Sequence, residues 1–347
     1  MKLLFVTRKY PPIVGGLETF SYDLYTALSK KVDVTLWANP KGNKYIVPFY
    51  IKTFFYLIFN AGRYTNIHLG DGALSLFIPL IRIVSRAKVT ITTHGRDVIL
   101  QNPPYQLVIP RCLKMADKIV CVSNYTLEEC VRRGIPRKKC VFIPNGINFE
   151  NIKKSTLKKA QIEKKFNLKL AQKKILFTVG RLVKRKGHEW FIREVMPKLG
   201  NEFIYVFGGE GPEKDNILKT IKEIRLKGRV FMLGKISDDE KNWFFDNAYY
   251  FIMPNIHVDG DAEGFGIVAI EAAAHGLPVI ASDVDGLRDA VIDQKTGFII
   301  PQKNSIKSIS LIENINLDKQ TLLQTIRKQF NGELILSNYI KILNHIK

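Results

Sequence analysis

The chain has 347 residues, of which 46% are hydrophobic, and a formal net charge of +21. This length accommodates two α/β domains, and the hydrophobic content excludes a disordered chain. The positive charge suits phosphorylated ligands, an anionic membrane surface or nucleic acid. It is spread over both halves without a basic tail or a nucleic-acid motif, however, so no nucleic-acid partner is expected.

Short apolar runs alternate with helical patterns through the first half of the chain. The apolar residues of 17–29 recur at the three- and four-residue steps of a helix. Strands are predicted at residues 3–7, 34–38, 89–93, 119–122 and 141–143.

A Lys-rich polar stretch at 150–172 indicates a domain boundary, and a second series of apolar runs follows it. Its strands are predicted at residues 175–179, 203–207, 229–232, 250–253 and 279–281. Alternating strands and helices are typical of parallel sheets covered on both faces. We therefore predict an α/β fold of two Rossmann-like, doubly wound domains, 1–150 and 151–330, with the helix in 331–347 packing back on the first domain. Ligands should bind in the cleft outside the carboxyl ends of the strands.

The chain shows no sequence signal for export or for membrane spanning. Its apolar start ends at Arg8, which is too early for a signal peptide, and the apolar segment 46–59 is too short to span a bilayer. That segment is expected to be a core helix or lid, or alternatively a helix lying in a membrane interface. We predict a cytoplasmic protein, with peripheral attachment to the inner face of the membrane as an extension of that prediction.

The four cysteines are separated by nine or ten residues, which matches no metal or redox motif. They are expected to be reduced and structural. These residues are Cys112, Cys121, Cys130 and Cys140.

Glycine-rich turns follow several predicted strands, where backbone amides can approach an anion. Gly15-Gly16 opens the first helix, and Gly208 begins a similar turn in the second half. The turn at Gly180 carries Arg181 and Lys186, five residues apart. A guanidinium fork and a compact ammonium together suit a diphosphate.

The most specific pattern is Glu263-Gly264-Phe265-Gly266-Ile267, followed by Glu271. A helix is predicted from Ile267 to Gly276, because Gly276 and Pro278 are a helix stop signal. One carboxylate lies before this helix and the other within it. A carboxylate only accepts hydrogen bonds, so Glu271 suits a ribose diol and Glu263 suits a sugar.

The chain resembles the family 4 retaining glycosyltransferases of the GT-B fold, also called glycosyl transferases group 1. Beside the glycine, Arg-Lys and Glu patterns, the resemblance rests on His94-Gly95-x-Asp97 and Pro144-Asn145-Gly146. It implies a nucleotide-sugar donor whose diphosphate is held by Arg181 and Lys186. It implies donor contacts, too, from first-domain glycines, from Asp97 and Asn145, and from the residues Gly180, Gly208, Gly264, Phe265, Gly266 and Ile267.

The same resemblance implies catalytic roles for His94, Arg181, Lys186 and Glu263. His94 ends a strand and should face the cleft, with Asp97 orienting it or capping the next helix. The two cations would stabilise charge on the departing diphosphate, so no metal or other cofactor is expected. Asp259-Gly260-Asp261 looks like a metal-binding Asp-x-Asp, but is predicted to be a solvated loop. Retention of configuration and a lipid-linked, glycan or polysaccharide acceptor are implied in the same way.

Other functions fit parts of this pattern. A sugar-nucleotide epimerase shares the two-domain plan, and a non-catalytic nucleotide-sugar binding protein would keep the same donor residues. A dinucleotide-dependent dehydrogenase is disfavoured, because the first glycine turn lacks Gly-x-Gly-x-x-Gly.

Overall fold

The computed structural model describes residues 1–13, 15–314 and 317–344. They form two compact units. The first contains Met1–Asn148, Asp259–Phe265 and the chain from Gly332 on, and the second contains Phe149–Val258 and Gly266–Asn331. Asp259–Phe265 thus belongs to the first unit, although the residues on both sides of it belong to the second.

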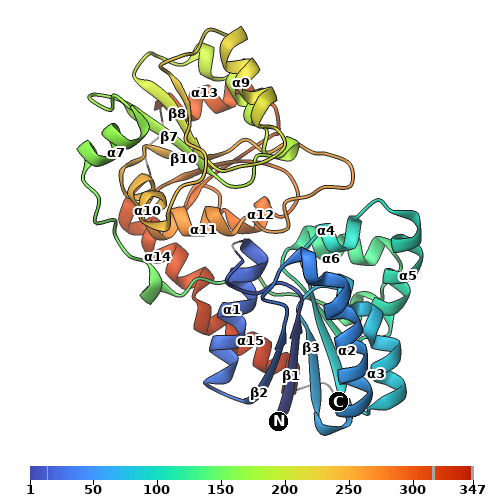
Figure 1. The fold of residues 1–347 in the computed structure, drawn as a ribbon. Coiled ribbons are helices and arrows are strands. Elements are labelled where there is room, and N and C mark those ends of the chain that lie inside the picture. The colour runs from blue at the N-terminus through green and yellow to red at the C-terminus, as the bar shows by residue number, and fades with distance from the viewer. Residues whose placement is uncertain (14, 315–316, 345–347) are drawn as a thin grey trace. The chain divides into compact units, whose positions relative to one another are not determined.

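The first unit is built on a parallel sheet that has six strands among the described residues, in the order β2-β1-β3-β4-β5-β6 (Figure 1). The strands are β1 (Lys2–Thr7), β2 (Asp33–Ala38), β3 (Asn66–Leu69), β4 (Lys88–Thr93), β5 (Lys118–Cys121) and β6 (Cys140–Phe142). The helices are α1 (Gly16–Ser29), α2 (Ile46–Asn60), α3 (Ile78–Val84), α4 (Arg96–Ile99), α5 (Pro103–Lys114), α6 (Asn124–Arg132) and α15 (Gly332–Asn344).

The central strand β1 is apolar on both faces because both faces are covered by helices. Leu3 and Phe5 point into a core with α1 and α15, whereas Leu4 and Val6 point into a core with α2 and α3. This alternation follows from the two-residue period of a strand. Figure 1 shows α1 and α15 on one side of the sheet and α2 and α3 on the other.

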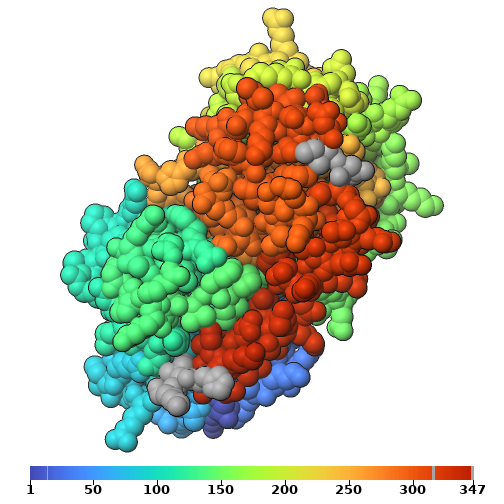
Figure 2. Space-filling model, turned by 180° about the vertical axis from the view of Figure 1, so that it is seen from behind, coloured from blue at the N-terminus to red at the C-terminus, as the bar shows by residue number. Residues whose placement is uncertain are grey.

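The C-terminal helix α15 completes the first unit. Its Tyr339 is buried, and the hydroxyl lies 3.3 Å from that of Thr92. Gly146 allows the close approach of α15, since a Cβ at that position would lie 2.9 Å from Ile335. In Figure 2 the red surface of α15 borders the blue surface of the N-terminal residues. The prediction that this helix packs on the first domain is therefore confirmed. The last residues of the predicted segment, 345–347, lie outside the described residues.

The second unit repeats the architecture, with the described strands in the order β12-β11-β10-β7-β8-β9, all parallel. The strands are β7 (Lys174–Val179), β8 (Phe203–Gly208), β9 (Val230–Met232), β10 (Tyr250–Met253), β11 (Val279–Ser282) and β12 (Gly297–Ile300). The helices are α7 (Lys159–Phe166), α8 (His188–Glu194), α9 (Lys214–Glu223), α10 (Asp238–Asn247), α11 (Ile267–Ala274), α12 (Leu287–Ala290), α13 (Ser305–Asn314) and α14 (Lys319–Phe330).

The predicted fold class is confirmed, and two strands were not predicted. Central strand β3 carries two buried polar residues, Asn66 and His68, so it lacks an apolar run. Edge strand β12 begins at Gly297, whose Cβ position lies 2.0 Å from the carbonyl oxygen of Val279. Strand pairing, rather than composition, makes both segments extended.

Candidate functional site

Strand order places one crevice in each unit. In a doubly wound sheet, ligands bind where two neighbouring strands are followed by loops that run in opposite directions. That point lies between β1 and β3 in the first unit, and between β7 and β10 in the second. The loops that leave the carboxyl ends of these four strands are therefore the candidate site segments.

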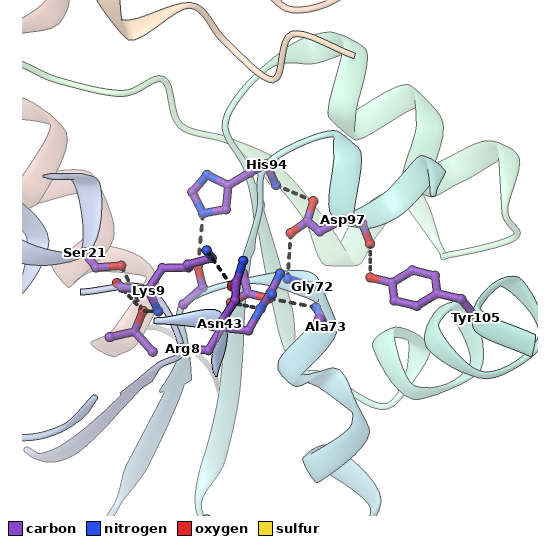
Figure 3. A network of polar contacts seen from close by, with 12 residues as sticks. Arg8, Lys9, Ser21, Asn43, Gly72, Ala73, His94, Asp97 and Tyr105 are labelled. Atoms are coloured by element: carbon purple, nitrogen blue, oxygen red, sulfur yellow. Dashed lines mark hydrogen bonds and ion pairs between the residues drawn. The ribbon is translucent and has the colours of Figure 1, made fainter. Parts of the chain in front are cut away.

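A network of polar side chains occupies the β1–β3 switch point (Figure 3). Arg8 follows β1, and its Nε donates to both carboxylate oxygens of Asp71, at 2.8 and 2.9 Å. Asp71 follows β3 and also accepts from the Ala73 amide at 3.0 Å, which caps the next short helix. The Asp71 side chain is 1% exposed and that of Arg8 is 22% exposed, so Arg8 is the member of this pair that reaches solvent.

His94 is held at the end of β4 by backbone groups. Its Nε2 lies 3.0 Å from the carbonyl oxygen of Gly70. A carbonyl only accepts, so Nε2 carries the proton and Nδ1 of the neutral ring is left as an acceptor. Burial lowers the pKa of His94, against the opposing effect of Asp97, and this favours the neutral ring.

Asp97 organises the turns on both sides of His94. One carboxylate oxygen accepts from the His94 amide at 2.8 Å, and the other accepts from the Gly72 amide at 2.6 Å. Burial raises the pKa of Asp97, although the two amides and His94 oppose that shift. Tyr105 donates to the Asp97 carbonyl at 2.6 Å. Asp97 is thus positioned to hold the His94 turn.

The segment around Glu263 lies against this turn within the first unit. A Cβ at Gly264 would be 2.1 Å from the His94 carbonyl oxygen, so only glycine allows this approach. Phe265 is buried and Glu263 is half-buried. Asp261 of the suspected Asp-x-Asp lies 3.8 Å from the Arg96 guanidinium.

Three other predicted residues of the first unit lie in different surroundings. Gly15 precedes α1, and the Glu18 carboxylate folds over it while pairing with Lys9 at 3.4 Å. Gly16 is the first residue of that helix. Asn145 is 4% exposed, and its Oδ1 has no hydrogen-bond partner among the described residues.

In the second unit, the loop after β7 carries the two predicted cations. Arg181 is exposed, whereas Lys186 is 6% exposed. The Lys186 ammonium lies 3.8 Å from the Cβ position of Gly180, so it extends over the end of β7. Gly187 has a φ of +67°, and a Cβ there would be 1.8 Å from the Pro254 carbonyl oxygen. The loop is therefore packed directly on the end of β10, at the switch point.

His188 directly follows this loop and anchors it through buried hydrogen bonds. The Thr178 hydroxyl donates its one proton to the Ile252 carbonyl at 2.6 Å, so it accepts from the Tyr205 hydroxyl. The Tyr205 hydroxyl has then used its own proton, so it accepts from Nδ1 of His188. Burial, and secondarily Lys186, lowers the pKa of His188 to about 3. The imidazole is therefore neutral beside the ammonium.

The glycines after β8 serve the packing of this loop. Cβ atoms at Gly209 and Gly211 would lie 1.8 Å from the carbonyl oxygen of Gly180 and 2.1 Å from that of Leu182. The Gly180 amide also donates to the Gly208 carbonyl at 3.0 Å. The glycine-rich turn thus approaches the neighbouring loop, which sequence reasoning did not anticipate.

Helix α11 starts at Ile267, as predicted, and ends at Ala274, with Gly276 just beyond at a φ of +79°. Gly266 precedes it at a φ of +91°, a conformation that favours glycine. Glu271 lies on this helix, 3.2 Å from the Lys241 ammonium. Its remaining oxygen lone pairs are still suited to hydroxyl donors.

The predicted residues are therefore divided between the units. The first unit contains Gly15, Gly16, His94, Asp97, Asn145, Glu263, Gly264 and Phe265. The second contains Gly180, Arg181, Lys186, Gly208, Gly266, Ile267 and Glu271. Sequence reasoning missed Arg8 and Asp71. The sequence signal for this pair would have been a charged residue soon after each of two neighbouring strands, Arg8 after β1 and Asp71 after β3. Because β3 was not predicted, this signal could not be recognised.

Two parallel sheets, each with a glycine-lined loop at its switch point, define the class of protein as GT-B. Residues 14–151 match the family described as Glycosyltransferase Family 4, and residues 159–330 match Glycosyl transferases group 1. The chain belongs to the group 1 glycosyltransferases of family 4.

Individual relatives are distant. A GDP-mannose-dependent alpha-(1-6)-phosphatidylinositol monomannoside mannosyltransferase of Mycobacterium tuberculosis is 25% identical over 71% of this chain and 65% of its own length. The chain thus spans slightly less than two thirds of that relative. An N-acetylgalactosamine-N,N'-diacetylbacillosaminyl-diphospho-undecaprenol 4-alpha-N-acetylgalactosaminyltransferase of Campylobacter jejuni is 32% identical over 54% of this chain and 48% of its own. HepE of Anabaena, solved with UDP, shares the fold at a TM-score of 0.78 and 17% identity over 99% of both chains.

Proposed function

We propose that this protein transfers a sugar from a nucleoside-diphosphate sugar to a lipid-linked, glycan or polysaccharide acceptor. Family membership and the names of the relatives support this reaction class. The observation that carries the proposal is the loop after β7, where the buried ammonium of Lys186 and the exposed guanidinium of Arg181 share the switch point of the second unit.

In the proposed reaction, the bond between the sugar and the diphosphate breaks and a bond to the acceptor hydroxyl forms, with retention of configuration. Arg181 and Lys186 stabilise the charge that develops on the departing diphosphate, so the step is proposed to need no metal. The N-terminus of α11 adds positive potential. Glu271 accepts from the ribose and Glu263 from the sugar. His94 Nδ1, the acceptor atom of the neutral ring, accepts from a sugar hydroxyl.

The test uses a panel of nucleotide sugars, screened by thermal shift and then assayed for transfer. Arg181→Ala and Lys186→Met should each lower kcat by at least ~100-fold, the usual cost of losing one transition-state electrostatic contact. Lys184→Ala is the matched control, because Lys184 is an exposed cation of the same loop, and it should stay within about 3-fold of wild type. Wild-type turnover in Arg181→Ala would refute the site.

Donor incubated without acceptor separates the alternatives. An epimerase would convert the donor sugar, and a binding protein would bind the donor without transfer. The proposed transferase should give only slow hydrolysis.

We also propose that the first unit attaches to an anionic membrane surface through α2. None of the described helices is long and apolar enough to cross a membrane. Helix α2 packs Phe49, Thr53 and Leu57 inward, yet it leaves a second apolar face uncovered. Large side chains on that face are 36–74% exposed: Val47, Ile51, Phe54, Phe55, Ile58 and Phe59.

Charge around α2 fits the same partner. No Asp or Glu occurs from Val34 to Gly70, whereas the cations Lys41, Lys44, Lys52 and Arg63 are all exposed. Each such cation near an anionic surface contributes about 1 kcal/mol. Tyr50 of α2 also lies near Arg8 and Asp71. Its burial, together with the charge of Asp71, raises the pKa of Tyr50 to about 12. A bound membrane would therefore lie one helix away from the polar network of the first unit.

Vesicle flotation tests this attachment. The double variant Phe55→Ser/Phe59→Ser should bind vesicles containing phosphatidylglycerol at least ~10-fold more weakly, because each phenyl ring loses apolar burial. Ile306→Ser is the matched control, since Ile306 is 82% exposed in the second unit. Equal binding to uncharged phosphatidylcholine vesicles would contradict the proposed attraction between the cations around α2 and anionic lipid. Unchanged binding of the double variant would contradict attachment through the apolar face of α2.

A further inference from the structure

Three of the four cysteines converge inside the first unit. Cys121 ends β5, Cys130 lies on α6, and Cys140 begins β6. Their Sγ atoms all lie within 4.8 Å of one another. Each is buried, and none is in a disulfide. Their spacing in sequence did not reveal this cluster.

The cluster follows from β–α–β geometry. Ile119 pairs with Cys140 across the parallel ladder, so Cys121, two residues after Ile119, points to the same face of the sheet as Cys140. Helix α6 connects these strands and packs on both of them, which brings Cys130 to that face. Nine- and ten-residue separations thus place three sulfurs at one point, without a Cys-x-x-Cys motif.

Three convergent sulfurs are the ligand set of a thiophilic cation. Zinc–sulfur bonds of about 2.3 Å place the sulfurs of one site roughly 3.8 Å apart. Each pair here needs to close by about 1 Å or less to reach that geometry. We propose that Cys121, Cys130 and Cys140 bind one thiophilic metal ion of the Zn(II), Cd(II) and Cu(I) class.

The surroundings suit the charge of such a site. Binding a divalent ion releases three thiol protons to solvent and leaves a net charge of −1, without oxidation or reduction. The cations Arg137 and Lys118 lie close to Cys140 and would offset part of that negative charge. The Thr93 hydroxyl lies 3.5 Å from the Cys121 sulfur and 3.3 Å from the Val120 carbonyl oxygen, and its single proton can serve the sulfur as an outer hydrogen bond to a ligand. A bound ion would fasten α6 and edge strand β6 to β5.

Cadmium provides the probe, because its thiolate complexes absorb in the ultraviolet and the reading needs no transferase activity. Reduced full-length protein should bind about one Cd(II) per chain and gain thermal stability. Cys130→Ser should lower the affinity by at least ~100-fold, since loss of a mere outer-shell partner already costs about 10–100-fold. If Cys130→Ser does not fold, Cys140→Ala removes a ligand at the sheet edge instead.

Cys112→Ser is the matched control, because Cys112 is also buried but lies outside the cluster. It should bind cadmium like wild type. Cadmium binding that survives both Cys130→Ser and Cys140→Ala would overturn the proposal. A disulfide between two cluster cysteines in protein purified without reductant, with no metal bound, would overturn it as well.

Discussion

Replacing Gly209 by alanine tests how the cation loop of the second unit is supported. Gly209 has a φ of +145°, and a Cβ there would lie 1.8 Å from the carbonyl oxygen of Gly180. The Gly180 carbonyl would have to move by about 1 Å or more to make room for the new carbon. Because Arg181 is the next residue, this movement would also displace Arg181. We expect a loss of stability together with weaker nucleotide binding.

The magnitude has two parts. A positive φ costs an L-residue about 1–2 kcal/mol. Forcing an extra carbon into a packed site costs about 1–3 kcal/mol more. Gly228→Ala separates the two parts, because Gly228 has a φ of +87° but no atom within 4 Å of its Cβ position. Gly228→Ala should lower the free energy of unfolding only by the cost of the positive φ. The free energies of unfolding of the two variants should therefore differ by about 1–3 kcal/mol.

Urea unfolding followed by tryptophan fluorescence measures this difference. Trp37 is in the first unit, whereas Trp190 and Trp243 are in the second. A Trp37→Phe background therefore makes the signal report the unit that contains both glycines. Equal destabilisation by the two substitutions would refute the claim that contact with Gly180 requires glycine. Normal nucleotide affinity in Gly209→Ala would refute its link to Arg181.

Two further predictions concern the second unit. The pKa of His188 is about 3 in the folded protein against 6.5 when unperturbed, so between these pH values the unfolded chain binds a proton that the folded protein does not. The free energy of unfolding should therefore fall as the pH drops below 6.5, by at most ~1.4 kcal/mol per pH unit. Urea titrations at pH 7, 6 and 5 measure this slope, and His188→Gln should flatten it. Ser237 caps α10 in a reciprocal pair with Glu240, so Ser237→Ala should cost about 1 kcal/mol by the same fluorescence assay, and a loss near zero would mean that this cap is dispensable.

Local pattern was sufficient where an element carries its own signal. The apolar run of β1 and the helix from Ile267, with its glycine stop, were predicted within a few residues. The glycine turn before Arg181 could also be located, because it directly follows a continuous apolar strand. Such features depend on neighbours in the chain, and the sequence alone therefore determined the α/β class and the family-like motifs.

Tertiary structure decided whatever depends on partners distant in the chain. The polar segment of β3 is a strand because β1 and β4 pair with it, and its position brings Asp71 to Arg8. The glycines after β8 are required by the loop after β7. Parallel register and a covering helix gather Cys121, Cys130 and Cys140, although their spacing matches no motif. Residue order specifies local conformation, but contacts between segments tens of residues apart exist only once the sheets have formed.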